Sequence, residues 1–303
     1  MKHWHRFLFI ILLTIVLIPA IILSGCAGRH SQASKPVVFV SILPQQYFVN
    51  KIAGGLVDVV VMVEPGASPH TYEPKPFQMA QLSQAAAYFS IGVEFEKVWL
   101  ARFAALSPRM LIIHSDTLIA KMSGHDFTKT LGQSRINDTY SPDSHEAVDP
   151  HIWLAPELVK QQAHTICTAL QRIDPLHAQL YSANCASFLK EIEQVQDTIH
   201  SFLKPGCTFM VFHPSWAYFS REFGLKQIAI EIDGKEPSPR ELAFIFEEAR
   251  IYHLSAIFVQ PQFSQQSAHV IARQLNGRVV IADDLAYNWA DNLISVAKAI
   301  ALQ

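Results

Sequence analysis

Charged residues are scarce in this chain, and the two signs nearly cancel. Lys, Arg, Asp and Glu make up 17% of the 303 residues, and the formal net charge at pH 7 is −2. Such a chain has no global field that would attract nucleic acid or an anionic membrane surface, so we expect no nucleic-acid partner. Half of the residues are apolar, which argues against disorder and allows one large or two modest folded domains.

Cysteine is also rare, with four residues in the whole chain. Cys26 closes an N-terminal apolar run, which leaves Cys167, Cys185 and Cys207 in the remainder. Cys167 and Cys185 lie at similar distances on either side of a helix break at residues 174–175, so an antiparallel helix pair would allow a disulfide between them. We expect Cys207, beside a strand-like run, to be a small buried apolar residue.

The N-terminus has the pattern of a targeting segment. Basic residues precede the apolar run of residues 7–22, and Leu-Ser-Gly-Cys at residues 23–26 follows it. A short apolar run after a basic start is typical of a signal peptide. Because Leu-Ser-Gly-Cys resembles a bacterial lipobox, we predict a lipoprotein signal peptide at 1–25, lipidation of Cys26 and a polar tether at 26–36. The folded part then lies in the periplasm or at the outer face of the cytoplasmic membrane, anchored to the membrane by its N-terminal lipid; an uncleaved membrane anchor is the alternative.

Strand-like and helix-like segments alternate along the rest of the chain. Apolar β-rich runs at 37–42, 58–63, 87–91 and 109–114 are separated by helical patterns, and the alternation resumes with runs at 208–212, 227–232, 257–259 and 279–281. This alternation predicts an α/β fold with parallel sheets. We expect an N-terminal α/β lobe at 37–173, a long linking helix at 174–204 and a C-terminal α/β lobe at 205–303, each lobe with a parallel β-sheet flanked by helices.

Three of the 14 histidines share one context, a neighbouring proline in a loop. Proline precedes His70 and His151 and follows His213, and Asp283 lies shortly after the strand-like run at 279–281. His70, His213 and Asp283 come after strands, at the edge where ligands of parallel sheets collect. Three imidazoles and a carboxylate form a tetrahedral nitrogen and oxygen shell that suits a borderline-soft divalent ion such as Zn²⁺.

The segments around these residues resemble the metal-binding motifs of periplasmic zinc-binding proteins, the cluster A-I solute-binding subunits of zinc and manganese ABC importers. The resemblance is carried by EPGASPHTYEP at 64–74, DPHIWL at 149–154, HPSWAYF at 213–219, GKEPSP at 234–239 and ADDLA at 282–286. It implies two lobes bridged by a rigid long helix, with one metal between them. It also implies capture of the metal for an ABC permease and its ATPase, by a protein that we expect to be a monomer.

The resemblance assigns metal ligation to four positions, His70, His151, His213 and Asp283. Manganese-selective members tend to carry glutamate where this chain has His213, so histidine there favours Zn²⁺ over Mn²⁺, which is the alternative. Asp284 adjoins Asp283, so the fourth ligand is Asp283, Asp284 or water. Many zinc-binding members have a dense histidine tract in the loop before the second ligand, which serves as an auxiliary metal-binding loop. The corresponding loop of this chain, residues 124–148, contains only two histidines, His125 and His145.

Two other functions are consistent with an extracytoplasmic zinc protein. A secreted zinc hydrolase needs an open metal position and a general base. The chain contains no His-Glu-x-x-His sequence, and Glu73 and Glu236 are the carboxylates that we consider as a base. Adhesion, as in some lipoproteins of the same family, is the other alternative. We therefore expect a carrier and no enzyme activity.

Overall fold

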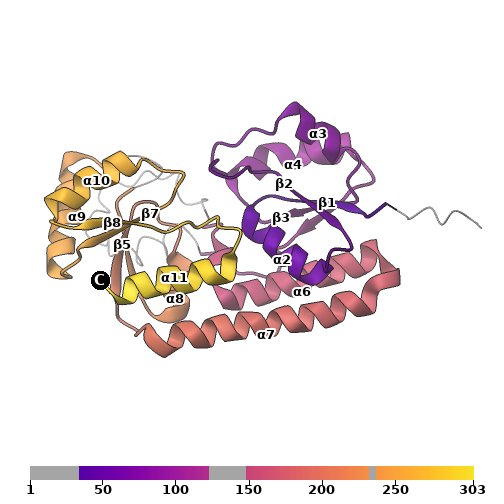
Figure 1. The fold of residues 1–303 in the computed structure, drawn as a ribbon. Coiled ribbons are helices and arrows are strands. Elements are labelled where there is room, and N and C mark those ends of the chain that lie inside the picture. Colours follow the sequence, from indigo (N-terminus) through magenta and orange to yellow (C-terminus); the bar gives the residue numbers. More distant parts are fainter. Residues whose placement is uncertain (1–33, 123–147, 232–236) are drawn as a thin grey trace, which may run out of the picture. The chain divides into compact units, whose positions relative to one another are not determined.

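The computed structural model describes residues 34–122, 148–231 and 237–303 (Figure 1). The predicted signal peptide with Cys26, and both His125 and His145, lie outside the described residues. Internal contacts divide the chain into residues Met1–Lys35 and one compact unit, Pro36–Gln303. Within the described ranges, no helix is both long and apolar enough to cross a membrane.

The first sheet of the compact unit contains four parallel strands in the order β2-β1-β3-β4. They are β1 (Val37–Val40), β2 (Asp58–Val61), β3 (Ala87–Ser90) and β4 (Leu111–His114). The central strand β3 is buried along its whole length, which explains its continuous apolar run. The helices that follow the first three strands are α2 (Leu43–Ala53), α3 (Pro76–Leu82) and α4 (Glu94–Leu106). Gly54 ends α2 in the left-handed conformation, with φ of 58°, which glycine adopts at low cost.

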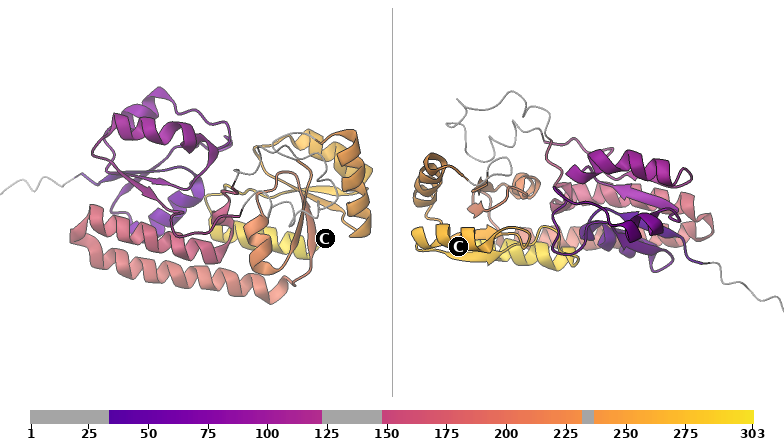
Figure 2. Two further views of the ribbon diagram at one scale, coloured as in Figure 1. Left: turned by 180° about the vertical axis from the view of Figure 1, so that it is seen from behind. Right: turned by 90° about the horizontal axis from the view of Figure 1, so that it is seen from above.

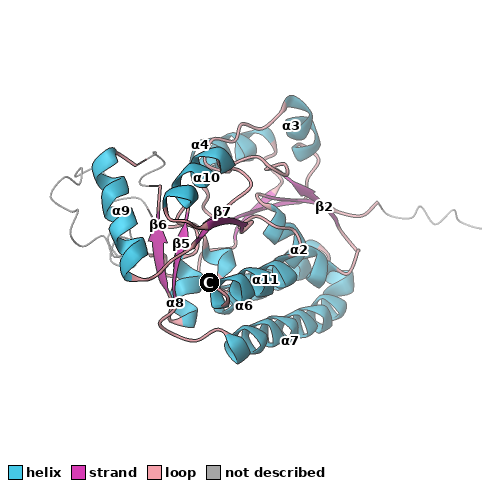
Figure 3. Cartoon of the chain, turned by 60° about the vertical axis from the view of Figure 1, so that its left-hand side comes forward, coloured by secondary structure: helices cyan, strands magenta, loops and turns pink. Residues whose placement is uncertain are grey.

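The second sheet repeats the same layout, with four parallel strands in the order β6-β5-β7-β8. The strands are β5 (Thr208–Val211), β6 (Lys226–Ala229), β7 (Ala256–Val259) and β8 (Arg278–Ile281). The helices of this half are α8 (Ala217–Phe223), α9 (Pro239–Ile251), α10 (Gln265–Gln274) and α11 (Trp289–Ala301), which lie around the strands in Figure 3. In both sheets the strand order reverses beside the first strand, and ligands of α/β proteins collect at the carboxyl ends there.

Two long helices connect the halves. The short helix η3 (Ile152–Leu154) leads into α6 (Pro156–Ile173), and after a turn, η4 (Pro175–His177), the chain returns in α7 (Ala178–Phe202). With 25 residues, α7 is about 38 Å long. It packs against α6, α2 of the first half and α11 of the second (Figure 2). The predicted α/β class with two parallel sheets is therefore confirmed, and α7 lies inside the predicted linking segment 174–204, whose boundaries as a domain stay a prediction.

The cysteines differ from expectation. Cys167 on α6 and Cys185 on α7 interact with each other, but both are free, buried thiols, so the predicted disulfide is not formed in this structure. Each sulfur instead lies near a carbonyl of the opposite helix, at 3.6 Å from Tyr181 O for Cys167 and 3.8 Å from Ala163 O for Cys185. Burial, together with the neighbouring Cys167, raises the pKa of Cys185 to about 12, so it stays protonated. Cys207 is only half-buried, at the edge of the core rather than inside it.

Candidate metal-binding site

Three histidines from separate loops meet at one place in the compact unit. One ring nitrogen from each of His70, His151 and His213 lies within 4.8 Å of those from the other two. His70 follows β2, His213 follows β5, and His151 lies just before α6, so both sheets contribute to the group. The structure thus brings together all three histidines that the sequence singled out.

The spacing of the rings suits a single small ion. The Nε2 atoms of His70 and His213 are 3.3 Å apart. Two nitrogens at 2.0–2.1 Å from a tetrahedral Zn²⁺ would be separated by about 3.4 Å. The ring centroid of His151 is 5.3 Å from that of His213 and 6.2 Å from that of His70. The cavity among the rings measures about 10 Å³, which is room for about one water-sized particle.

Each histidine has its own carboxylate on the nitrogen that faces away from the group. His151 Nδ1 is 2.6 Å from Asp149 Oδ1, and His213 Nδ1 is 3.0 Å from Glu231 Oε2. For the third pair, His70 Nδ1 is 3.1 Å from Glu94 Oε2. A carboxylate keeps the proton on Nδ1 and leaves the lone pair of Nε2 for a metal, which is the usual arrangement around metal-bound histidine.

The loop of His70 is held by two neighbouring helices as well as by its prolines. The main-chain N–H of Phe95, at the start of α4, donates to Pro69 O at 3.2 Å. The Phe95 ring meets Tyr72 edge-on at 5.8 Å, and the Tyr72 hydroxyl donates to Gln78 Oε1 of α3 at 2.8 Å. The main chain on both sides of His70 is therefore anchored.

His151 is fastened to the second half of the molecule. Its main-chain N–H donates to Asp149 Oδ1 at 2.9 Å, and its ring lies 5.1 Å from that of Trp153. The Tyr218 hydroxyl donates to Asp149 O at 2.8 Å, and Trp153 Nε1 donates to Asp284 O at 2.6 Å. Both bonds join the loop of His151 to residues beyond α7.

His213 is fixed by its main chain and by stacking. Gln260, just after β7, donates to His213 O at 2.8 Å and accepts from its N–H at 3.3 Å. The His213 ring stacks on Phe263 with centroids 4.7 Å apart and planes inclined by 16°. Little rotation is open to this ring.

The buried histidines differ in pKa although both pair with a carboxylate. Burial alone would lower the pKa of His151, but Asp149, with a smaller effect of Asp284, outweighs it and raises the pKa above the ordinary value. Burial lowers the pKa of His213, and the hydrogen bond to Glu231 opposes this only in part. Burial would raise the pKa of Glu94, but its contact with His70 lowers the value to about 2. His213 is therefore neutral at pH 7, whereas protons compete with a metal for His151 at a higher pH than for an ordinary histidine.

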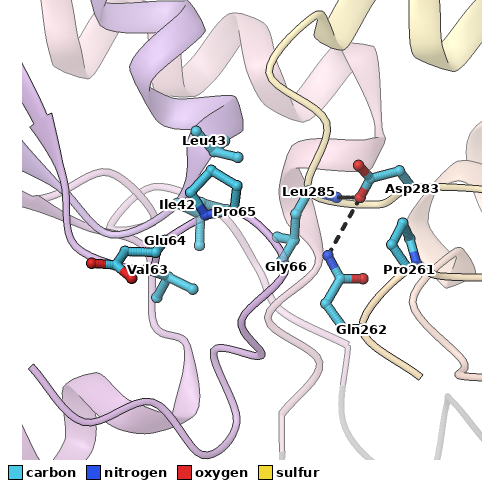
Figure 4. Close-up of a pocket in the computed structure, with 10 residues that line it drawn as sticks. All are labelled: Ile42, Leu43, Val63, Glu64, Pro65, Gly66, Pro261, Gln262, Asp283 and Leu285. Carbon is cyan, nitrogen blue, oxygen red and sulfur yellow. Dashed lines mark hydrogen bonds between the residues drawn. The ribbon is translucent and has the colours of Figure 1, made fainter. Parts of the chain in front are cut away.

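Asp283, predicted as the fourth ligand, does not join the histidine group. Its Oδ1 accepts from the Leu285 main-chain N–H at 2.9 Å and lies 3.5 Å from Gln262 Nε2 (Figure 4). It lines a separate cavity of about 60 Å³ beside the loop of residues 64–66. Its neighbour Asp284 is buried and lines the cavity of the three histidines instead. The two adjacent aspartates of the loop after β8 therefore line different cavities.

Glu73, one of the two carboxylates considered as a catalytic base, does not line the histidine cavity. Glu73 is exposed on the loop beyond His70, and Glu236 lies outside the described residues. Glu94, Asp149 and Glu231 contact Nδ1, on the side away from the shared cavity, and among the described carboxylates only that of Asp284 belongs to a residue that lines the cavity.

Glu94, Glu231 and Phe263 were not among the site residues predicted from the sequence, and Asp149 was named only as part of a motif. The positions of Glu94 and Glu231 in the sequence could nevertheless have identified them. Glu94 begins the helix after β3, and Glu231 follows β6, so both stand just beyond the carboxyl ends of parallel strands. Asp283 was predicted as a ligand because it follows a strand in this way, and the same reasoning applies to Glu94 and Glu231.

Known proteins resemble the chain over nearly its whole described length. The family described as "Zinc-uptake complex component A periplasmic" (ZnuA) matches residues 38–301. The high-affinity zinc uptake system protein ZnuA of Yersinia pestis is 27% identical over 274 residues, covering 86% of each chain. A crystal structure of ZnuA is 41% identical with a TM-score of 0.80 and covers 89% of this chain and 99% of its own. A ZnuA deletion mutant with zinc bound is also 41% identical, with a TM-score of 0.78, and covers 88% of this chain and 97% of its own.

The family match, the parallel sheets joined by a long helix and the histidine group agree with one another. This chain belongs to the ZnuA family of periplasmic zinc-uptake components.

Proposed function

We propose that this protein captures one Zn²⁺ outside the cytoplasm and delivers it to an ABC permease driven by its ATPase. The observation that carries the proposal is the convergence of His70, His151 and His213, each with a carboxylate on Nδ1. In this role the metal is cargo, and the protein's work is to bind, hold and release it. An N-terminal lipid at Cys26 and a monomeric state are parts of the same proposal.

The donor set supports zinc as the cargo. Three neutral imidazole nitrogens are ligands that Zn²⁺ accepts readily, whereas Mn²⁺ favours shells rich in oxygen. The cavity is small, and the 3.3 Å between two Nε2 atoms is close to the spacing on a tetrahedral zinc ion. A carrier is favoured over a hydrolase because the described carboxylates at the site are engaged with Nδ1 or, like Asp284, packed beside the ligands.

Metal analysis with competition tests this function. We expect protein purified without added metal to bind one Zn²⁺ per chain and to retain it against an excess of Mn²⁺. The His213→Ala variant should bind zinc at least ten-fold more weakly, because a ligand is lost. Ester or peptide hydrolysis that needs zinc and disappears in His213→Ala would contradict the carrier function.

A further inference from the structure

The three histidine–carboxylate pairs are unequal, and the inequality points to an order of metal exchange. Resting on the proposed function, we propose that His70 is the ligand through which the metal enters and leaves, and that Glu94 is the positioning residue that sets the release rate. His151 and His213 then form the half of the site that holds the metal until last.

Exposure separates the pairs. The side chains of His151 and Asp149 are 7% and 3% exposed, and those of His213 and Glu231 are 9% and 6% exposed. The His70 and Glu94 side chains are 31% and 35% exposed. Water therefore reaches the His70 side of the group, and a ligand that dissociates there can be replaced by water at once. The other two histidines have no such access.

Hydrogen-bond geometry separates them in the same way. The contacts of His151 with Asp149 and of His213 with Glu231 are hydrogen bonds of 2.6 and 3.0 Å. Glu94 Oε2 is 3.1 Å from His70 Nδ1, yet this buried oxygen makes no hydrogen bond of good geometry with any described residue. The pair at His70 is thus held by proximity and charge rather than by a well-aligned bond, and its ring turns more easily.

Ring contacts complete the contrast. Trp153 packs against the His151 ring, and Phe263 stacks on the His213 ring. The ring contacts of His70 are with those two histidines themselves. Because the main chain around His70 is anchored by Phe95 and by proline, motion at this position is a rotation of the side chain, not of the loop.

The physical consequence is that Glu94 controls how long His70 stays on the metal. A negative charge on Nδ1–H makes Nε2 a better donor and keeps the ring turned toward the site. Removal of that charge should weaken the bond to His70 first, and water then takes the open position. Loss of the charge beside His213 should matter less for the release rate, because Gln260 and Phe263 still hold that ligand.

The test measures zinc release from the full folded chain into excess chelator by stopped-flow. We expect Glu94→Ala to release zinc about 10- to 100-fold faster than the unaltered protein, with Glu94→Gln in between because the amide oxygen keeps a partial negative charge beside Nδ1–H. Glu231→Gln, a near-isosteric change at a buried pair, should speed release by at most a few-fold. Glu73→Ala, which removes an exposed carboxylate from the loop that carries His70, should leave the release rate unchanged.

A second measurement reports on the ring itself without metal. In ¹⁵N–¹H correlation spectra of chelator-treated protein, we expect His70 to carry its proton on Nδ1 in the unaltered chain and to lose this preference in Glu94→Ala. A general loss of folding would shift the spectra of all three histidines together and would be visible in Glu94→Gln as well.

The outcomes separate this inference from the proposed function. Release from both Glu94 variants at the unaltered rate, or faster release from Glu231→Gln than from Glu94→Gln, would overturn the inference while one-to-one zinc binding still stands. If the unaltered protein binds no stoichiometric zinc, both the function and the inference fail.

Discussion

At the scale of single residues, Asp283 and Asp284 show how one position along the chain changes the role of a carboxylate. Asp283 accepts from the Leu285 N–H, and this bond lowers its pKa while burial, the larger effect, raises it. Asp284 lies in the wall of the histidine cavity, where its charge helps to raise the pKa of His151. Of these two carboxylates, that of Asp284 is the one that acts electrostatically on His151.

We expect Asp284→Asn to weaken zinc binding by about ten-fold and Asp283→Asn to change it by less than about three-fold, because a neutral amide no longer stabilises the divalent ion. The two variants are matched controls for each other, since they differ by one position and have the same chemistry. Zinc affinity measured by competition with a fluorescent chelator checks this. A larger loss in Asp283→Asn would mean that this side chain leaves Leu285 and turns to the metal on binding.

At the scale of elements, the first turn of α4 connects the site to the sheet. Glu94 contacts His70, the Phe95 N–H donates to Pro69 O, and Glu96 accepts from the main chain that follows β3. Glu96 is buried and also accepts from Ser41 after β1, so it spans the point where the strand order reverses. Burial raises the pKa of Glu96 to about 7.

The raised pKa of Glu96 makes the metal-free protein less stable as the pH rises. The Glu96 carboxyl holds its proton more tightly in the folded state than in the unfolded state. Its contribution to the free energy of unfolding is therefore fully present below about pH 4.5 and is lost as the pH rises through about 7. In Glu96→Gln, the difference in unfolding free energy between pH 5 and pH 8 should be smaller by up to about 3 kcal/mol, because this titrating group is removed. Urea unfolding with chelator present, at each pH, measures the slope, and equal slopes in both proteins would refute the assignment.

At the scale of the whole molecule, the group of three histidines depends on both sheets being held together. α7 packs against α2 of the first half and α11 of the second. Trp289 Nε1 donates to Trp153 O at 2.6 Å, and the Met122 N–H donates to the Tyr218 hydroxyl at 2.7 Å. Such buried bonds between the halves favour a site that is largely assembled before metal arrives.

Zinc affinity should depend on pH because protons and metal compete for the imidazoles. The pKa of His151 lies above its ordinary value and that of His213 below it, so proton competition at His151 begins near neutral pH and strengthens as the pH falls. We expect the dissociation constant to rise by about ten-fold or more between pH 7.5 and pH 5.5. Competition titrations across this range, with the ionic strength held constant, measure the change. An affinity that stays flat over this range would exclude coordination by imidazole.

Much of the fold could be predicted from the chain because its signals are local. Apolar β-rich runs marked all eight strands of the described residues, with strand ends that differ from the predicted ones by one to three residues. The first run overshoots β1 by two residues, where Gln45 takes the Ser41 N–H. The buried face of α7 is a different matter, because packing against the partner helix α6 decides which side is covered. Tyr181 and Cys185 on α7 are buried, whereas the apolar side chain of Leu180 is exposed.

The sequence by itself determined the α/β class and the three histidines, because strand alternation and proline neighbours are properties of short segments. Only the tertiary structure decided which carboxylate serves which histidine. His70 and Glu94 are far apart along the chain and meet because β2 and β3 flank the same strand, β1. It also placed Asp283 against the Leu285 N–H and Asp284 in the wall of the histidine cavity, since the direction of a side chain in a loop depends on the contacts that the folded chain makes around it.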